Sequence, residues 1–204
     1  LRQLKLEITT ESIVETDYQD IRRISMIMTN SGPVLTYLTD DGVLRVQSMV
    51  SRRNLLTGKV TTTVSGGSLQ LDLTQRGIPQ WLDLSGRGDT VFLAWPDGHL
   101  LRVDSRNLND LVVAEELSLI PAGDATLTAF SFLIGRTTLV AGDSKGRLGA
   151  WFRTRPEGTG TSDGSKLTLA HDLGQGPDAV VALAPSTRSR LLAAGFADGT
   201  VRTY

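Results

Sequence analysis

The stretch VFLAWPDGHLLRV (91–103) contains two apolar runs separated by the turn residues Pro96, Asp97 and Gly98. A glycine after an aspartate readily adopts the positive φ that a tight reversal between two twisted strands requires. The stretch therefore predicts a β-hairpin with its turn at Gly98.

The same phrase occurs three more times along the chain. The turn glycines of the four copies are 56, 48 and 53 residues apart, and each interval leaves room for about four strands. The other copies are VLTYLTDDGVLRV (34–46), TLVAGDSKGRLGAW (138–151) and LLAAGFADGTVRTY (191–204), with turn glycines Gly42, Gly146 and Gly199.

Each hairpin has further strand candidates around it. One apolar strand is expected before each hairpin, and a less regular outer strand is expected after the first three. The preceding strands are RRISMIMTN (22–30), PQWLDLS (79–85), LTAFSFLIG (127–135) and AVVALAPS (179–186). The outer strands are TGKVTTTVSG (57–66), which LRVQSMVSRR (44–53) feeds, VVAEELSLI (112–120), SKLTLAHDLG (165–174) and KLEITTE (5–11).

Sheets of about four strands that repeat every 40–50 residues or so are typical of β-propeller blades. We therefore expect an all-β chain that forms a β-propeller-like array of about four four-stranded antiparallel blades. Residue 1 is Leu, and residue 204 lies in the third strand of the last copy, so we expect an excised part of a larger propeller. The expected blades are 20–75, 76–124, 125–175 and an incomplete 176–204, with 1–12 as a stray outer strand.

The repeats resemble those of WD-repeat and related propeller families, whose blades close the third strand with Asp-Gly, apolar residues and Trp-Asp. Trp151 and Tyr204 stand five residues after their turn glycines, where such repeats carry an aromatic residue. Gln47 and Val103 occupy that place in the first two copies, and no Trp-Asp pair follows any turn. The resemblance therefore implies a divergent propeller.

Composition and charge fit an ordinary β domain. Forty per cent of the residues are hydrophobic and 21 are glycine, enough for a core and many turns. No segment reaches the ~20 apolar residues of a membrane-spanning helix, so this piece itself is not expected to cross a membrane. The net charge is −1, so no nucleic-acid partner is expected. The arginines are scattered, many of them in pairs: Arg22/Arg23, Arg52/Arg53, Arg153/Arg155 and Arg188/Arg190.

Candidate catalytic and metal-binding side chains are few. The chain has no cysteine, which excludes disulfides, thiolate zinc sites and cysteine nucleophiles. His99 and His171 are 72 residues apart without a Gly-x-Ser-x-Gly motif, so we interpret both as surface or turn histidines. Five aspartates lie beside the turn glycines, and turn chemistry explains them better than a calcium site does. They are Asp40, Asp41, Asp97, Asp143 and Asp198.

Three glycine-rich pieces could be taken for phosphate cradles. VSGGS (64–68), SGRGD (85–89) and EGTGTSDGS (157–165) all lack the G-x-x-x-x-G-K-[ST] pattern between a strand and a helix. The Arg-Gly-Asp at 87–89 matches a cell-adhesion tripeptide, but we interpret it as a turn between a first and a second strand. We expect residues 157–165 to form the most mobile loop.

Tryptophans and arginines of the repeats are expected to be structural. Trp81, Trp95 and Trp151 lie at apolar-patterned positions, which favours packing between blades over stacking on a ligand. Three arginines are expected to make blade-to-blade contacts rather than bind phosphate. Arg45 and Arg202 stand three residues after their turn glycines, and Arg102 matches them if its copy has one extra residue.

SGRGDTVFLAWPDGHLLRVD (85–104) and SRLLAAGFADGTVRTY (189–204) resemble the propeller-type domain of the large permease subunits of some phosphate ABC transporters. This resemblance implies a non-catalytic accessory domain at the periplasmic face of the bacterial inner membrane, within a parent chain that crosses the membrane. It implies other transporter subunits or a periplasmic binding protein as partners. It implies no catalytic, cofactor-binding or metal-binding residue here.

Two alternatives stay open. One is a free-standing soluble β-propeller scaffold for protein–protein interaction, in the cytoplasm. The other is a propeller enzyme or lectin that binds a small molecule where the loops between fourth and first strands converge. Its candidate residues are Tyr18, Asp20, Gln75, Arg76, Asp124 and Gln175.

Overall fold

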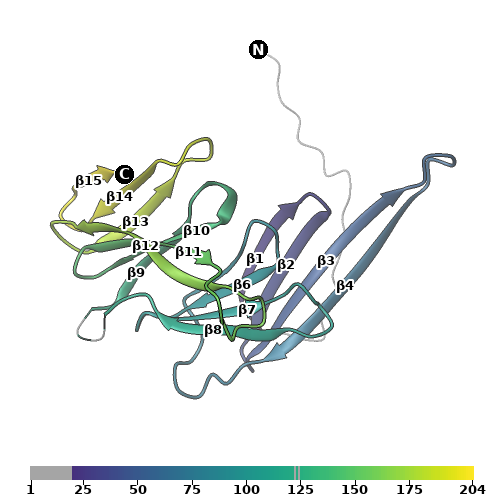
Figure 1. Cartoon of the computed structure of the whole chain (residues 1–204), viewed down its shortest axis with the longest axis horizontal. Helices are drawn as coiled ribbons and strands as arrows, with labels where there is room; N and C mark the ends of the chain where they lie inside the picture. The colour runs from purple at the N-terminus through teal and green to yellow at the C-terminus, as the bar shows by residue number, and fades with distance from the viewer. Residues whose placement is uncertain (1–19, 122, 124) are drawn as a thin grey trace, which may run out of the picture.

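The computed structural model describes residues 20–121, 123 and 125–204 of the chain. These residues form four antiparallel sheets that follow one another as an open arc (Figure 1). Within each sheet the strands follow chain order, so every connection inside a sheet joins neighbouring strands. The strand expected within 1–12 lies outside the described residues. The all-β, propeller-like array of antiparallel sheets is confirmed.

We number the sheets in chain order. Sheet one contains β1 (Ile21–Thr29), β2 (Gly32–Thr39), β3 (Val43–Arg53) and β4 (Val60–Gln70). Sheet two contains β5 (Trp81–Leu84), β6 (Thr90–Ala94), β7 (His99–Asp104) and β8 (Val112–Ser118). Sheet three contains β9 (Leu127–Phe132), β10 (Thr138–Asp143), β11 (Arg147–Thr154) and β12 (Lys166–Gln175). Sheet four contains β13 (Val180–Pro185), β14 (Leu192–Phe196) and β15 (Val201–Thr203).

A short 3₁₀ turn, η1 (Ile134–Arg136), lies between β9 and β10. It is the one helical element in the part of the chain that the structure describes. Across that same part, no helix has the length and apolar character that crossing a membrane requires.

The four predicted hairpins are confirmed as β2–β3, β6–β7, β10–β11 and β14–β15. Their turn glycines all have a positive φ, a conformation that costs a glycine little because it has no Cβ. The φ angles are +85° at Gly42, +84° at Gly98, +80° at Gly146 and +87° at Gly199.

Three apolar layers lie between successive sheets and form the core. Leu44 and Leu93 belong to the layer between sheets one and two, and both are fully buried. Strand residues alternate between the two faces of a sheet, so each inner sheet contributes to two layers. On β7, Leu101 belongs to the layer toward sheet one, whereas Leu100 belongs to the layer toward sheet three. The last layer, between sheets three and four, contains Val180.

All three tryptophans pack between sheets, as predicted. Trp95 belongs to the layer between sheets one and two, and its indole Nε1 donates a hydrogen bond of 2.9 Å to the carbonyl of Gly77. Trp151 is buried between sheets two and three. Trp81 of sheet two stacks on Phe130 of sheet three, with ring centroids 6.1 Å apart.

One outward face of the arc is apolar. Ile24, Met26 and Met28 alternate along β1 on the side of sheet one that is turned away from sheet two, and they are 62%, 64% and 74% exposed. Val64 of β4 is also exposed. On this face, β1 thus presents a row of three exposed apolar side chains.

Sheets one and two approach closely at a glycine. Gly67, from the glycine-rich VSGGS piece, lies in β4 and not in a phosphate-binding loop. A Cβ at Gly67 would stand 1.6 Å from the carbonyl oxygen of Leu108, which lies in the β7–β8 connection. The contact between the two sheets therefore leaves no room for a side chain there.

Gly67→Ala should lower the free energy of unfolding by about 1–3 kcal/mol, because the added methyl group overpacks a contact with backbone. Urea unfolding followed by circular dichroism measures the change. Gly160→Ala is the matched control: its Cβ would meet no atom within 4 Å, so a change of about 0.5 kcal/mol or less is expected. Equal effects of the two substitutions would contradict the close approach.

Candidate functional site

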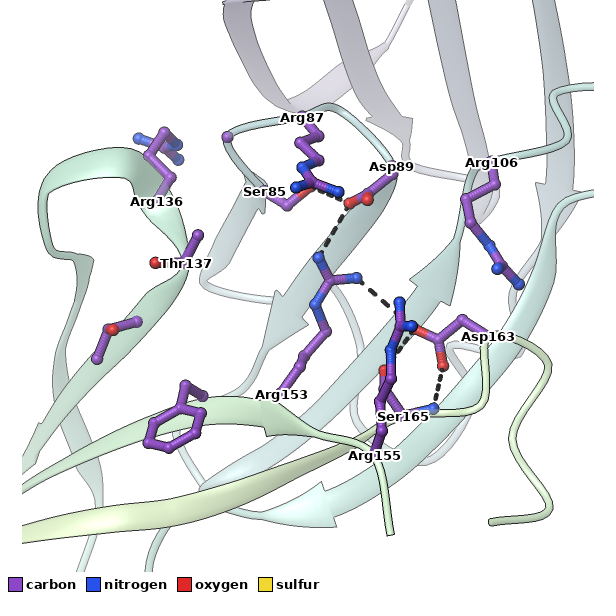
Figure 2. A pocket seen from close by; sticks show the side chains of 13 residues that line it. Ser85, Arg87, Asp89, Arg106, Arg136, Thr137, Arg153, Arg155, Asp163 and Ser165 are labelled. Atoms are coloured by element: carbon purple, nitrogen blue, oxygen red, sulfur yellow. Dashed lines mark hydrogen bonds and ion pairs between the residues drawn. The ribbon is translucent and has the colours of Figure 1, made fainter. Parts of the chain in front are cut away.

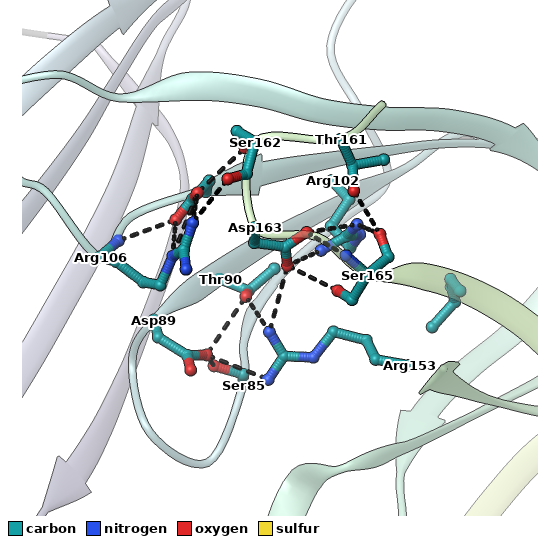
Figure 3. A network of polar contacts seen from close by, with 12 residues as sticks. Ser85, Asp89, Thr90, Arg102, Arg106, Arg153, Thr161, Ser162, Asp163 and Ser165 are labelled. Atoms are coloured by element: carbon teal, nitrogen blue, oxygen red, sulfur yellow. Dashed lines mark hydrogen bonds and ion pairs between the residues drawn. The ribbon is translucent and has the colours of Figure 1, made fainter. Parts of the chain in front are cut away.

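The candidate site lies between sheets two and three, in the middle of the arc. It is on the side where the strands are joined by the connections β5–β6, β7–β8, β9–β10 and β11–β12. Figure 3 shows a network of polar side chains on this side. The network is built around Arg102 of β7, a guanidinium with no exposed surface. A buried charge is tolerated only where partners replace its water, so its contacts define how the two sheets meet.

Arg102 does not occupy the same repeat position as Arg45 and Arg202, because its copy lacks the extra residue that this match requires. Leu44 and Leu100 are the equivalent positions of the two hairpins. Each stands two residues after its turn glycine, and each pairs with the residue four positions before that glycine, Leu38 or Ala94. Arg102 is therefore one residue further along its strand than Arg45 is along β3. Because side chains alternate, this places Arg102 toward the following sheet and the other two arginines on the opposite face.

Arg102 binds three groups, one on β8 of sheet two and two on the β11–β12 connection of sheet three. Its Nε donates to Glu115 Oε2 of β8 at 3.0 Å, and its Nη2 donates to the carbonyl oxygen of Ser165 at 2.6 Å. Both terminal nitrogens also contact the carboxylate of Asp163, with Nη2 at 3.2 Å from Oδ1. Glu115 in turn accepts from the backbone N–H of Leu167 at 2.9 Å. The predicted blade-to-blade role of Arg102 is confirmed.

The end of the β11–β12 connection is held against sheet two by further bonds. The hydroxyl of Ser162 donates to Asp104 Oδ2 at 3.0 Å, and Arg106 donates to the Ser162 carbonyl at 2.9 Å. Within the connection, Thr161 donates to the Ser165 carbonyl at 2.8 Å. The expectation of a mobile loop over 157–165 is therefore wrong for its second half, because residues 161–165 carry the polar groups that pair with sheet two.

Asp163 is ionised well into the acid range. Burial alone would raise its pKa, but hydrogen bonds from Arg102 and from the Ser165 hydroxyl, together with the positive charge of Arg102, hold the pKa far below its usual value. The Ser165 hydroxyl lies 2.7 Å from Asp163 Oδ2. The carboxylate is thus a permanent negative charge at neutral pH.

Arg153 makes a second bridge between the sheets. It lies on β11, and its Nη1 donates to the Thr90 hydroxyl at 2.8 Å while its Nη2 lies 3.3 Å from Asp89 Oδ1. Asp89 also accepts from the Ser85 hydroxyl at 2.7 Å. Asp89 is the aspartate of the Arg-Gly-Asp tripeptide, whose residues form the β5–β6 turn as predicted, with the Gly88 N–H bonded to the Ser85 carbonyl at 2.9 Å.

A pocket of about 350 Å³ opens beside these bridges (Figure 2). Gly86 and Arg87 of the β5–β6 turn, Thr137 after η1 and the end of β11 contribute to its walls. Asp89 and Asp163 are the only two acidic residues that line it among the described residues, and five arginines accompany them. The arginines are Arg87, Arg106, Arg136, Arg153 and Arg155.

The arginines of this pocket fall into two groups. Arg106, Arg136 and Arg153 have carboxylate partners, and Arg136 also donates to the Leu84 carbonyl at 2.9 Å. Arg87 and Arg155 are exposed and have no hydrogen bond or ion pair within the described part of the chain. Figure 2 shows these two and Arg153 around the same space. The pocket therefore carries positive charge that no neighbouring side chain neutralises.

The sequence predicted no site residue, and this pocket was missed. Arg153 and Arg155 stood out only as one of several scattered arginine pairs. The signal that could have indicated the pocket is their alternation at the end of a strand, which directs both toward one face. They lie 66 and 68 residues after Arg87 in the chain (153 − 87 and 155 − 87). Their proximity to Arg87 depends on the packing of sheet two against sheet three, which no local sequence pattern reveals.

Three of the five turn aspartates have the structural role that the sequence predicted. Asp97 accepts from the backbone N–H of His99 at 3.0 Å, Asp143 from that of Lys145 at 2.8 Å, and Asp198 from that of Thr200 at 2.9 Å. These bonds stabilise the turns that contain Gly98, Gly146 and Gly199. No group of three or more acidic, histidine or cysteine side chains able to hold a metal occurs among the described residues.

The two histidines lie on different sheets, as part of β7 and β12. The Nε2 atom of His99 is 3.7 Å from a carboxylate oxygen of Glu116, and its ring centroid is 5.4 Å from that of Trp95. Burial and the charge of Arg76 lower the pKa of His99, against the opposing effect of Glu116 and Asp97. This histidine is therefore neutral at pH 7.

The residues proposed for a small-molecule site are not gathered into one cluster. Arg76 pairs with Asp97 across a distance of 2.9 Å, near sheet one. Gln175, at the end of β12, binds the Lys145 carbonyl at 2.8 Å and receives a bond from Arg202 to its own carbonyl at 3.2 Å. Asp20 precedes β1, and Tyr18 and Asp124 lie outside the described residues.

Arg202 therefore contacts sheet three, as predicted for a blade-to-blade arginine. Its guanidinium also lies 5.5 Å from the centroid of the Phe196 ring. Arg45 lies on the face of sheet one that is turned away from sheet two, the face opposite to Leu44. Only Arg102 of the three repeat arginines is directed into the junction of sheets two and three.

Comparison with solved structures places the fold among β-propellers. The chain is similar to the β-propeller domain of Cps50 (Swd1) from Myceliophteria thermophila, with a TM-score of 0.53, 14% sequence identity, and coverage of 87% of this chain and 50% of that one. It is also similar to the Dos1 propeller, with a TM-score of 0.53, 17% identity, and coverage of 88% and 40%.

The chain thus spans half or less of the length of these two propellers. At these identities the likeness concerns the fold alone. No protein-family model matches the sequence, and no curated protein sequence does. The WD40-like propeller resemblance is supported, whereas no comparison links the chain to a phosphate transporter permease.

Arg102→Met should lower the free energy of unfolding by about 3–5 kcal/mol, because it removes the cation that Glu115 and Asp163 share and leaves Asp163 only the longer ion-pair contact of 3.6 Å with Arg153. Arg202→Met, in the corresponding hairpin of sheet four, removes an exposed arginine and should cost about 1 kcal/mol or less. Urea unfolding of both variants gives the comparison. Similar losses would show that Arg102 contributes no more than a surface arginine.

The depressed pKa of Asp163 predicts how stability depends on pH. The folded state binds fewer protons than the unfolded state, so this contribution is complete above the ordinary aspartate pKa of about 3.9 and is lost as the pH falls below it. The stability difference between the parent chain and Asp163→Asn should therefore shrink as the pH falls through 4. Urea unfolding at several acid pH values measures it, and a constant difference would contradict the assignment.

Proposed function

We propose that the chain acts as a non-catalytic scaffold for protein–protein interaction. The observation that carries this proposal is the charged pocket at the junction of sheets two and three, which polar contacts between the two sheets hold open. Four connections lie on this side of the propeller-type arc. Connections on a rigid sheet scaffold are where propellers and other β folds present binding residues.

The sequence supports a narrower proposal as well. In it, the scaffold is the periplasmic accessory domain of a phosphate transporter permease subunit, and its partners are transporter subunits or a periplasmic binding protein. The propeller neighbours support the broader interaction scaffold better than this narrower assignment. Location at the periplasmic face, or in the cytoplasm for a free-standing scaffold, is a proposal that the full reading frame around the chain would test.

The scaffold proposal predicts a stoichiometric protein complex. A partner captured by crosslinking in cells should bind the purified chain in isothermal titration calorimetry, with an interface that protects amides from hydrogen exchange. Protection should concentrate in the connections 85–89, 105–111, 133–137 and 155–165 rather than in the strands. If none of the captured proteins forms a complex with the chain when both are purified, the scaffold proposal is wrong.

A further inference from the structure

The pocket between sheets two and three has two layers of charge. In the inner layer, Asp89 and Asp163 are already matched: Ser85 and Arg153 bond the first, and Arg102 and Ser165 bond the second. Carboxylates with this many donors have little capacity to neutralise further cations. The charged groups of the inner layer therefore pair with one another within the protein.

The outer layer is not balanced. Arg87 and Arg155 line the pocket, are exposed, and have no polar partner among the residues that the structure describes. They come from different sheets, because Arg87 is on the β5–β6 turn and Arg155 follows β11. Two guanidinium groups on opposite sides of one hollow form a site for a planar anion, since each can bind an oxyanion through paired N–H donors.

We propose that this pocket binds an acidic segment of a partner protein, with Arg87 and Arg155 pairing with its carboxylate or phosphate groups. This inference rests on the proposed scaffold function and specifies the chemistry of the partner. Arg153 lines the same hollow, but its guanidinium is already paired with Asp89.

The dimensions and the walls favour a peptide over a small free ion. A volume of about 350 Å³ falls in the range of pockets that enclose a ligand of several groups. Phe152, 40% exposed, provides an apolar wall next to the arginines, and Thr137 adds a hydroxyl. A segment with acidic groups and a carbon skeleton would use both kinds of surface.

A nucleic acid fits this surface less well than a peptide does. Nucleic-acid binding requires positive charge spread along a face so that many phosphates are neutralised at once. Here the chain as a whole has a net charge of −1, and the uncompensated charge is confined to one hollow. The local excess matches a short acidic segment.

The walls of the site are braced before any ligand arrives. The Thr90 hydroxyl lies 2.8 Å from Arg153 Nη1, and Asp89 fixes the other terminal nitrogen. The Asp163 carboxylate holds the connection that follows Arg155, through its contact with Arg102. Less backbone ordering entropy is therefore lost on binding than for two arginines carried on unbraced connections.

The test is a titration of the full chain with synthetic peptides, followed by NMR of backbone amides and arginine Nε–H groups. Three peptides of one length are used: one rich in glutamate, one with phosphoserine in place of the central glutamates, and one with glutamine throughout. The acidic peptides should shift the signals of Arg87, Arg153 and Arg155, and added salt should weaken their binding. The glutamine peptide should cause no saturable shift. The tighter of the two acidic peptides identifies the preferred anion.

Arg87→Gln/Arg155→Gln should weaken binding of the acidic peptides about tenfold or more, since it removes two charge-assisted contacts. The matched control is Arg52→Gln/Arg53→Gln, which removes the same charge from exposed positions at the end of β3 and should leave binding unchanged. Equal weakening by both double variants would show that binding depends only on the net charge of the chain, and would refute the proposed site. The absence of saturable shifts with either acidic peptide would also overturn it.

The same variants separate this proposal from the scaffold proposal. If a reconstituted partner complex keeps its affinity in Arg87→Gln/Arg155→Gln, the scaffold function stands and the acidic-segment site is refuted. If no partner complex forms at all while the peptides bind at the pocket, the scaffold function fails and the anion site stands.

Discussion

A guanidinium with no exposed surface lies where sheets two and three meet, and the geometry of that junction depends on it. Arg102 exchanges the solvation that it would have in water for contacts with Glu115, Asp163 and the Ser165 carbonyl. Glu115 lies on β8 of sheet two, whereas Asp163 and Ser165 lie in the β11–β12 connection of sheet three. Polar contacts have narrow ranges of distance and angle, so they fix the junction more tightly than apolar packing alone would.

The charged pocket is a by-product of this arrangement. The connection that supplies Asp163 and Ser165 also follows Arg155, and the turn that supplies Asp89 also carries Arg87. Binding the inner carboxylates to buried or half-buried arginines leaves the outer arginines without carboxylates to pair with. The same side chains that brace the two sheets therefore determine the charge of the surface above them.

Much of the fold could be predicted from the sequence, because it depends on local chemistry. Asp-Gly turns and alternating apolar residues indicated four hairpins with their flanking strands, and the structure has them. The site could not be predicted, because it depends on one-residue differences and on long-range contacts. A shift of one position turns Arg102 to the face opposite to Arg45, and Asp163 lies in a glycine-rich segment whose composition suggested mobility.

The linear order of the sheets has a consequence for how the molecule opens. Among the described residues the apolar layers join successive sheets, so the arc resembles a one-dimensional stack in which stability is the sum of units and of the interfaces between them. In that part of the chain, sheets one and four each contribute to one of these layers, whereas sheets two and three each contribute to two. Local opening should therefore begin at the two ends and proceed inward. The pair of sheets that frames the arginine pocket would be the last to lose its structure.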